Sequence, residues 1–255
     1  IGFFDLTGIE DFTALTYLNC SNNQITSLDV SSNIALIDLY CQGNQITSLD
    51  VSGATALTTL YCQDNQLTSL DLGGATALTY LSCFDNQLTS LDVSNNTALT
   101  WLNCYDNLLT SLNLNGATAL EGLYAWNNQL VNLDVSQNTS LISLLCNNNQ
   151  LISLDLSQIS CALQINESDF SENPNLNCVE VTDLSCWQNN YIGFLDTTYQ
   201  YYSNNCSGTS IQEHNTNKEL LKVTDLLGRE TTDNKDEVLF YIYDDGTVKK
   251  KIIIE

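Results

Sequence analysis

The chain has 255 residues, of which 30 are Asp or Glu and 7 are Lys or Arg, so its formal net charge is −23 at pH 7. All seven basic residues lie after position 217, which leaves residues 1–217 with 21 carboxylates and no Lys or Arg. Nucleic acids and anionic bilayers need clustered basic side chains, so neither is an expected partner. No run of 18 apolar residues occurs, so direct membrane insertion is not expected either.

A 21-residue unit is repeated seven times without a gap over residues 13–159, and its fixed positions read LxxLxCxxNxLxxLxV. Repetition at such a period is typical of a solenoid, in which each unit packs against its neighbours. Leu18 and Cys20 stand two apart and therefore point to the same side of a strand, with outward-facing residues beside them. Leu28 and Val30 repeat this alternation, which predicts a second short extended segment in each unit.

The unit resembles the leucine-rich repeat, whose LxxLxLxxN segment forms one strand of a parallel sheet, here with Cys in place of the third Leu. The resemblance implies a mainly β solenoid with a parallel concave sheet and with short extended segments and turns on the convex side. Helices are not expected within the repeats, because Ser, Asn, Gly and Thr fill most of the remaining positions. Residues 1–12 look like part of a preceding irregular repeat, so we expect the natural chain to begin earlier.

Two of the recurring residues have a structural interpretation. An inward Asn amide can satisfy backbone groups at the sharp turn that follows each strand. The Cys residues occupy a Leu position and are expected to be buried free thiols, although neighbouring strands lie within the range of Cα distances that disulfides tolerate. We expect no metal site, because the only His, His214, lies outside the repeats, and no cofactor. The two sets are Asn23, Asn44, Asn65, Asn86, Asn107, Asn128 and Asn149, and Cys20, Cys41, Cys62, Cys83, Cys104 and Cys146, with Ala125 in the sixth copy.

An acidic ladder recurs on the predicted convex side. Carboxylates stacked at strand spacing repel one another, so something must compensate. The favoured interpretation is that each accepts hydrogen bonds from the turn that follows, since an Asn amide can do the same; bound cations are the alternative. The ladder consists of Asp29, Asp50, Asp71, Asp92, Asp134 and Asp155, with Asn113 substituting once.

The aromatic residues of the repeats are confined to the outward strand positions. Such rings beside carboxylates indicate an interaction surface. The alternative is that Tyr and Trp are simply good strand residues, but the equally extended convex segment has no aromatic residue. The expected concave binding face consists of Tyr17, Tyr40, Tyr61, Tyr80, Phe84, Trp101, Tyr105, Tyr124 and Trp126, with Asp64, Asp85 and Asp106 at one edge.

Two kinds of ligand suit this face. Rings with carboxylate acceptors suit the faces and hydroxyls of a glycan, and the same rings can anchor a protein. The resemblance to leucine-rich repeats favours a protein. Catalysis by Asp64, Asp85 and Asp106 at a separation of about 5 Å is a weaker hypothesis, because an open sheet offers no pocket to raise one pKa. We therefore expect a binding protein and no enzyme, and a purely structural surface protein is a further alternative.

The repeats are followed by a degenerate repeat and cap over residues 160–206. Four Cys residues cluster there, and they allow three pairings. The preferred pairs are Cys178 with Cys206 and Cys161 with Cys186. Disulfides here would place the protein outside the cytoplasm.

A polar linker over residues 207–217 leads to the basic tail, residues 218–255. Two predicted strands, 238–243 and 247–254, flank Asp244, Asp245 and Gly246, which is a hairpin pattern, and 220–227 supplies a third strand. Three strands from so few residues leave exposed edges, which favours an external partner that adds a strand.

The tail resembles a short form of the C-terminal sorting signal of the type IX secretion system of Bacteroidetes. The resemblance implies that residues 218–255 bind the outer-membrane secretion machinery. It also implies export through the periplasm to the cell surface or the medium. The residues that carry it are Val223, Asp225, Gly228, Arg229, Tyr241, Asp244, Asp245, Gly246 and Lys249.

Overall fold

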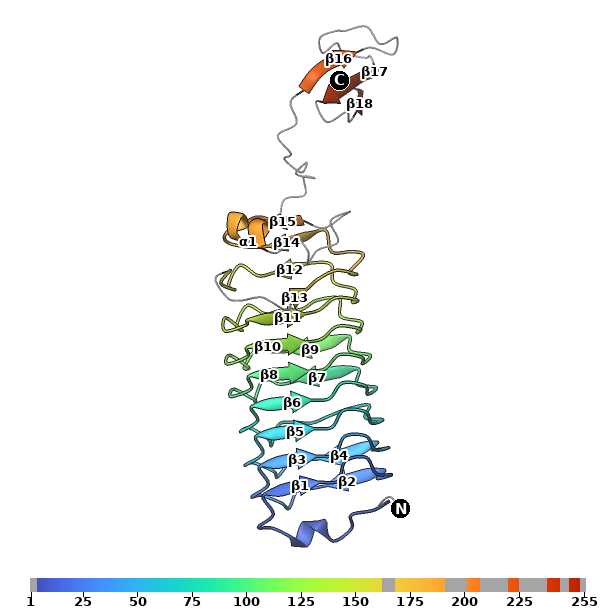
Figure 1. Ribbon diagram of the computed structural model, residues 1–255, viewed down its shortest axis with the longest axis vertical. Helices are drawn as coiled ribbons and strands as arrows, with labels where there is room; N and C mark the ends of the chain where they lie inside the picture. Colours follow the sequence, from blue (N-terminus) through green and yellow to red (C-terminus); the bar gives the residue numbers. More distant parts are fainter. Residues whose placement is uncertain are drawn as a thin grey trace. The chain divides into compact units, whose positions relative to one another are not determined.

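The computed structural model describes residues 4–161, 168–190, 201–206, 220–224, 238–243 and 248–252. The chain divides into two compact units, Ile1–Cys206 and Ser207–Glu255. In the first unit each 21-residue copy forms one coil, and Figure 1 shows the coils stacked from the N-terminal end to the cap. The mainly β solenoid expected from the sequence is confirmed.

One strand from each coil joins a parallel eight-stranded sheet in the order β1-β3-β5-β6-β8-β10-β11-β13. Each Leu of the LxC segment pairs with the same Leu of the next copy, as Leu18 does with Leu39 and Leu81 with Leu102. The strands are β1 (Tyr17–Asn19), β3 (Asp38–Tyr40), β5 (Thr59–Tyr61), β6 (Tyr80–Ser82), β8 (Trp101–Asn103), β10 (Gly122–Tyr124), β11 (Ser143–Leu145) and β13 (Ser168–Asp169). The outward side of this sheet is called the sheet face below.

The second extended segment forms short strands on the opposite side of the coils (Figure 1). They pair in three groups, β2-β4, β7-β9 and β12-β14-β15. In the third and sixth copies the corresponding residues, 69–71 and 132–134, are not in a strand. The strands are β2 (Ser27–Asp29), β4 (Ser48–Asp50), β7 (Ser90–Asp92), β9 (Ser111–Asn113), β12 (Leu154–Asp155), β14 (Cys178–Glu180) and β15 (Tyr201–Ser203).

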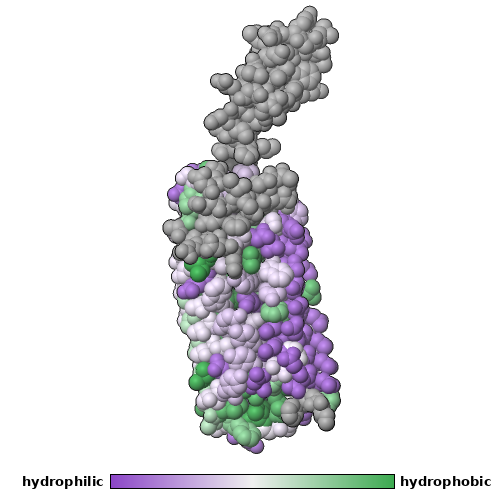
Figure 2. Space-filling model, viewed as in Figure 1, coloured by the Kyte–Doolittle hydropathy of each residue, from purple (hydrophilic) through white to green (hydrophobic). Residues whose placement is uncertain are grey.

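Between the two sets of strands lies a continuous apolar core of Leu, Ile, Val, Ala and Cys side chains. All six ladder Cys residues are buried and free, as predicted. Burial raises the pKa of the Cys83 thiol to about 12, so the thiols are un-ionised at neutral pH. The visible surface in Figure 2 is mainly hydrophilic with scattered hydrophobic residues, and hydrophobic residues gather at the N-terminal end of the first unit. Phe4 and Phe12 are 63% and 61% exposed, and between them a 3-10 helix spans Ile9–Asp11.

From the second copy onward, the Asn of each copy ties its coil to the coil before it. The side-chain amide nitrogen of Asn86 donates to the carbonyls of Cys83 and of Cys62 in the preceding copy, both at 3.1 Å. Its oxygen accepts the backbone N–H of Leu67 at 2.9 Å. The same bonds recur from Asn44 to Asn149, so the structural role expected for this ladder is confirmed.

A second type of contact between coils is made at the last residue of the 21-residue repeat. Asn96 Nδ2 donates to the carbonyls of Leu72 and Ala75 in the preceding coil, at 3.4 and 2.8 Å. The fifth copy has Ala117 at this position, preceded by Gly116, whose Cβ would lie 1.7 Å from the carbonyl oxygen of Ser94. The coils with Asn at this position therefore bond the preceding coil through an amide, and those with Gly-Ala pack their backbone tightly against it.

The cap begins with an eighth, irregular coil. Phe170 and Asn173 occupy the Cys and Asn positions of the 21-residue repeat. Asn173 Nδ2 donates to the carbonyls of Cys146 and Phe170. Helix α1 (Leu184–Asn190) follows. Asp183 caps its N-terminus by accepting the N–H of Cys186 at 3.0 Å. Trp187 is buried and closes the core beside Phe170.

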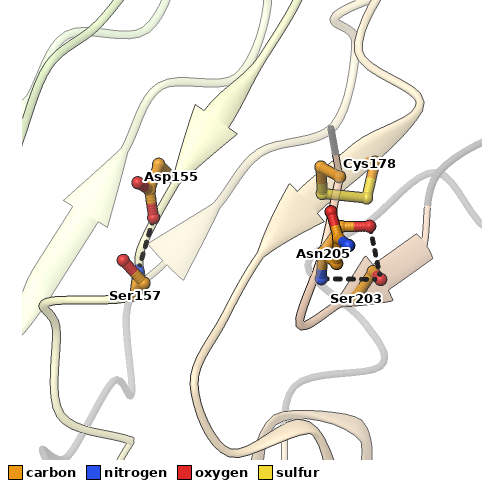
Figure 3. Close-up of a disulfide and its surroundings, with 6 residues drawn as sticks. Asp155, Ser157, Cys178, Ser203 and Asn205 are labelled. Atoms are coloured by element: carbon orange, nitrogen blue, oxygen red, sulfur yellow. Dashed lines mark hydrogen bonds between the residues drawn. A yellow bond between two sulfur atoms is a disulfide. The ribbon is translucent and has the colours of Figure 1, made fainter. Parts of the chain in front are cut away.

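Two disulfides fasten the cap, Cys161–Cys186 and Cys178–Cys206. These are the pairs preferred from the sequence. Figure 3 shows the second one beside Ser203, whose hydroxyl accepts the backbone N–H of Asn205 at 3.2 Å. The Cys178–Cys206 disulfide thus joins β14 to the segment that follows β15, at the end of the first unit. Two disulfides indicate a protein that works outside the cytoplasm.

The second unit contains an antiparallel sheet of β16 (Leu220–Thr224), β17 (Val238–Tyr243) and β18 (Val248–Ile252). Val238 pairs with Ile252 and Ile242 with Val248, so the predicted hairpin is confirmed. Of the residues that carry the resemblance to a sorting signal, Val223, Tyr241 and Lys249 lie in these strands. Asp225, Gly228, Arg229, Asp244, Asp245 and Gly246 lie outside the described residues.

Asn86→Ala tests how much the Asn ladder contributes. The substitution leaves the Leu67 N–H and the Cys62 carbonyl buried without their partner, so we expect the free energy of unfolding to fall by about 2–4 kcal/mol. Urea denaturation followed by circular dichroism measures it. The adjacent exposed residue supplies the control, since Gln87→Ala is expected to change stability by less than about 0.5 kcal/mol. Equal stability of the two variants would contradict the assigned role.

Candidate functional site

The nine predicted aromatic residues all lie on the sheet face, in three columns that run across the strands. They alternate along each strand with the buried Leu and Cys side chains, so they point away from the core. Tyr17 is 53% exposed and the other eight are half-buried. The first column has Tyr17, Tyr80 and Trp101, the second has Tyr40, Tyr61 and Tyr124, and the third has Phe84, Tyr105 and Trp126.

Most of these rings stack on one another. Tyr40 and Tyr61 stack with ring centroids 5.0 Å apart, and the run continues from Tyr61 to Tyr80 at 4.9 Å. In the third column, Tyr105 lies between Phe84 and Trp126 at 4.3 and 4.1 Å, with interplanar angles of 10°. The faces of Tyr105 are thus occupied by its neighbours, which leaves the ring edge for contact with another molecule. The sequence could not show this arrangement, which depends on side-chain torsions.

Trp101 is placed differently. Its indole lies over Gly122 of the next strand, where a Cβ would approach the indole Cε3 atom to 2.1 Å. It meets Tyr124 edge to face, with ring centroids 5.7 Å apart and an interplanar angle of 71°. Gly122 therefore makes the room in which this indole lies across the sheet.

Polar groups lie between the rings. Asn103 Nδ2 donates to the Tyr80 hydroxyl at 2.9 Å. The pKa of Tyr61 is raised to about 12, first by burial and then by its hydrogen bond with Tyr80. Ser82, on the same side of β6 as Tyr80, is 1% exposed, and its hydroxyl has no hydrogen-bond partner. The floor of the sheet face is thus polar in places beneath the aromatic surface.

The acidic ladder on the opposite side is explained by its turns. Each carboxylate accepts the backbone N–H two residues later, as Asp50 does from Ser52 at 2.9 Å, and Asn113 accepts the same bond from Asn115. Hydrogen bonds from Ser52 lower the pKa of Asp50. The predicted interpretation of this ladder is confirmed. Figure 3 shows the last member, Asp155, bonded to Ser157.

Asp64, Asp85 and Asp106 form a second acidic row, at the edge of the sheet face. All three have a left-handed backbone, with φ of 54°, 48° and 49°. Burial raises the pKa of Asp85, and the charges of Asp106 and Asp64 add to this effect. Asp106 Oδ1 accepts from Asn127 Nδ2 at 2.6 Å. Burial, and then the same carboxylates, also raise the pKa of the adjacent Tyr105.

We call these three carboxylates, together with Phe84, Tyr105 and Trp126, the aromatic-acidic strip. Its residues come from consecutive coils, and the regular pairing of the sheet places them side by side. Among the described residues, no group of three or more His, Cys, Asp or Glu is arranged to hold a metal ion. Within the same residues, no helix has the length and apolarity needed to cross a membrane.

The comparisons with known proteins agree with this fold. The family described as Leucine Rich repeats (2 copies) matches residues 13–53. No curated protein matches the chain's sequence. The functional domain of InlJ from Listeria monocytogenes, whose description includes a cysteine ladder, is 34% identical, with a TM-score of 0.52, over 70% of this chain and 46% of that one. This chain is a leucine-rich repeat protein.

Two further structures resemble it. YopM, a leucine-rich effector protein from Yersinia pestis, is 25% identical over 69% of this chain and 47% of that one, with a TM-score of 0.56. Internalin C2 from Listeria monocytogenes is 21% identical over 76% and 84%, with a TM-score of 0.56, which shows the fold alone. The chain spans about half the length of InlJ and of YopM.

Gly122→Ala tests the placement of Trp101. The new methyl group would overlap the indole, so we expect a loss of about 1–3 kcal/mol in the free energy of unfolding and a red shift of tryptophan emission. The same substitution is also made in a Trp101→Thr variant, which lacks the indole. Thr is chosen because Thr59 occupies the equivalent position of another copy. In this variant the Gly122→Ala change is expected to cost less than about 0.5 kcal/mol. The same penalty in both backgrounds would contradict the assigned contact.

Proposed function

We propose that this leucine-rich repeat protein is an exported, non-enzymatic binding protein whose sheet face holds a glycan or a protein ligand. The observation that carries the proposal is the gathering of nine aromatic side chains on that face. The strands on the opposite side have Ser, Leu, Asp and Asn at the corresponding positions of the repeats. Good strand propensity alone does not account for this asymmetry. Leucine-rich repeat folds are typically interaction scaffolds, which supports a binding role.

A catalytic role for the acidic row is less well supported. Asp85 has a raised pKa, which a general acid needs. However, it stands in a regular row on the edge of a sheet, between two carboxylates of the same kind. A glycosidase instead places its two carboxyl groups in different environments, so that their pKa values separate.

The binding role is tested with glycan and peptide arrays probed by the full chain and by a Trp101→Thr, Trp126→Gln double variant. Both substitutions use residues that other copies have at these positions, Thr59 and Gln63, so the fold is expected to survive. We expect array signals of the wild type to fall at least about tenfold in the double variant, because aromatic anchors dominate such interfaces.

The control for the arrays is Val131→Ala with Ile152→Ala, which removes exposed apolar side chains (42% and 55% exposed) outside the strands of the sheet. This control is expected to bind as the wild type does. Array patterns that are identical for the wild type and the double variant would contradict a binding role for the sheet face.

We further propose that residues 218–255 act as a type IX sorting signal and bind the outer-membrane secretion machinery. The support is the resemblance of the tail's sequence and its formation of a separate small antiparallel sheet. A sheet of three short strands has edges at β16 and β18 that a partner strand could extend. In this proposal the first unit is the cargo, with the periplasm as an intermediate compartment.

The sorting role is tested in a Bacteroidetes host with a signal peptide added to the chain. We expect the full chain to reach the medium or cell surface and the chain without residues 218–255 to stay folded in the periplasm, because only the tail would engage the machinery. Fractionation with immunoblotting measures this. A fluorescent protein fused to residues 218–255 supplies the matched gain-of-function measurement, and we expect it to be secreted. Normal secretion of the truncated chain would refute the sorting role.

A further inference from the structure

The fold does not require the charges of the acidic row. The position occupied by Asp64, Asp85 and Asp106 needs a residue that adopts a positive φ. Asn meets this need in three other coils, at Asn22, Asn127 and Asn148, with φ between 51° and 55°. Neutral amides at all these positions would avoid the repulsion that contributes to the raised pKa of Asp85. The negative charge therefore calls for a reason outside the fold.

The two acidic rows of the solenoid differ in this respect. On the opposite side, hydrogen bonds within the turns stabilise the charged forms, and the pKa values of Asp50 and Asp92 are lowered. On the sheet face, Asp85 shows the reverse shift. Residues 1–217 contain no Lys or Arg that could neutralise it. Any positively charged side chain that balances this row therefore comes from outside residues 1–217.

The neighbouring rings limit what kind of molecule can bind beside this row. A sugar ring binds aromatic residues through their faces, but the faces of Tyr105 are covered by Phe84 and Trp126. What the strip offers instead is a rigid apolar wall of ring edges beside carboxylates that are exposed at Asp64 and Asp85 and half-buried at Asp106. Ser82, two residues before Phe84 on the same side of β6, adds a buried hydroxyl that has no hydrogen-bond partner within the chain.

Building on the proposed binding role of the sheet face, we propose that the aromatic-acidic strip docks a basic, extended segment of another protein through its Arg side chains. A guanidinium presents several N–H donors in a planar fork and bonds carboxylates in pairs. Its weak hydration suits a site beside aromatic rings. Asp106 is held in place for such a contact by the amide of Asn127.

The spacing of the row suits an extended peptide. Neighbouring strands lie about 4.8 Å apart, so Asp64 and Asp106, two strands apart, are separated by roughly 9.6 Å. A polyproline helix rises about 3.1 Å per residue and has three residues per turn, so Arg residues at i and i+3 point the same way about 9.3 Å apart. One such pair can contact Asp64 and Asp106 and share Asp85 between them.

The test measures binding of the full chain to a synthetic proline-rich peptide with Arg at every third position, by isothermal titration calorimetry. A peptide with citrulline in place of Arg keeps the shape and removes the charge. We expect the Arg peptide to bind at least about tenfold more tightly, and the triple variant Asp64→Asn, Asp85→Asn, Asp106→Asn to lose that difference. Asn is already present at this turn position, so folding is expected to be preserved.

The matched control is Asp50→Asn, Asp71→Asn, Asp92→Asn, which makes the same change in net charge on the opposite side, where Asn113 shows that Asn fits. This variant is expected to bind within about twofold of the wild type. Equal weakening by both triple variants, or equal binding of the two peptides, overturns the inference. Glycan signals that depend on Trp101 and Trp126, without binding of the Arg peptide, also overturn it but leave the proposed binding role intact.

Discussion

The amide of one Asn per coil is the interaction on which the rest of the structure depends. The amide forms hydrogen bonds with backbone groups of its own coil and of the preceding coil. It therefore closes the turn after each strand and holds the two neighbouring coils at a fixed distance. Backbone groups stranded inside a turn without such a partner would be costly. Because the same bonds recur between successive coils, the strands begin at equivalent residues of the repeat. The sheet therefore keeps one register along its length.

That register fixes how the side chains are arranged on the sheet face. Side chains at equivalent positions stand about one strand spacing apart, which is close enough for Phe84, Tyr105 and Trp126 to stack. Stacking stabilises the rings and uses up their faces. The same spacing brings carboxylates together until they repel. A face built in this way is held in place by its own contacts, and it presents ring edges, hydroxyls and uncompensated charge to any ligand of the kind proposed.

Much of this was predictable from the sequence because the period is strict. The buried and outward positions, the Asn bonds, the free thiols and the turn contacts of Asp50 and its equivalents follow from the spacing alone. The positions of the eighth coil could not be assigned from the period. Asn173 lies 27 residues after Cys146, whereas the equivalent separation in the repeats is 24. Helix α1 is too short to show a period, and the indole of Trp101 over Gly122 depends on torsions that no pattern encodes.

The uniformity of the inter-coil bonds also bears on how such a protein changes over generations. Every boundary between regular coils has the same amide in the same place, so the boundary on either side of a gained or lost 21-residue unit can re-form with unchanged chemistry. Unequal recombination between copies would then alter the length of the sheet without creating an ill-fitting junction. The sheet face of this protein can therefore evolve through a change in its length as well as through substitution.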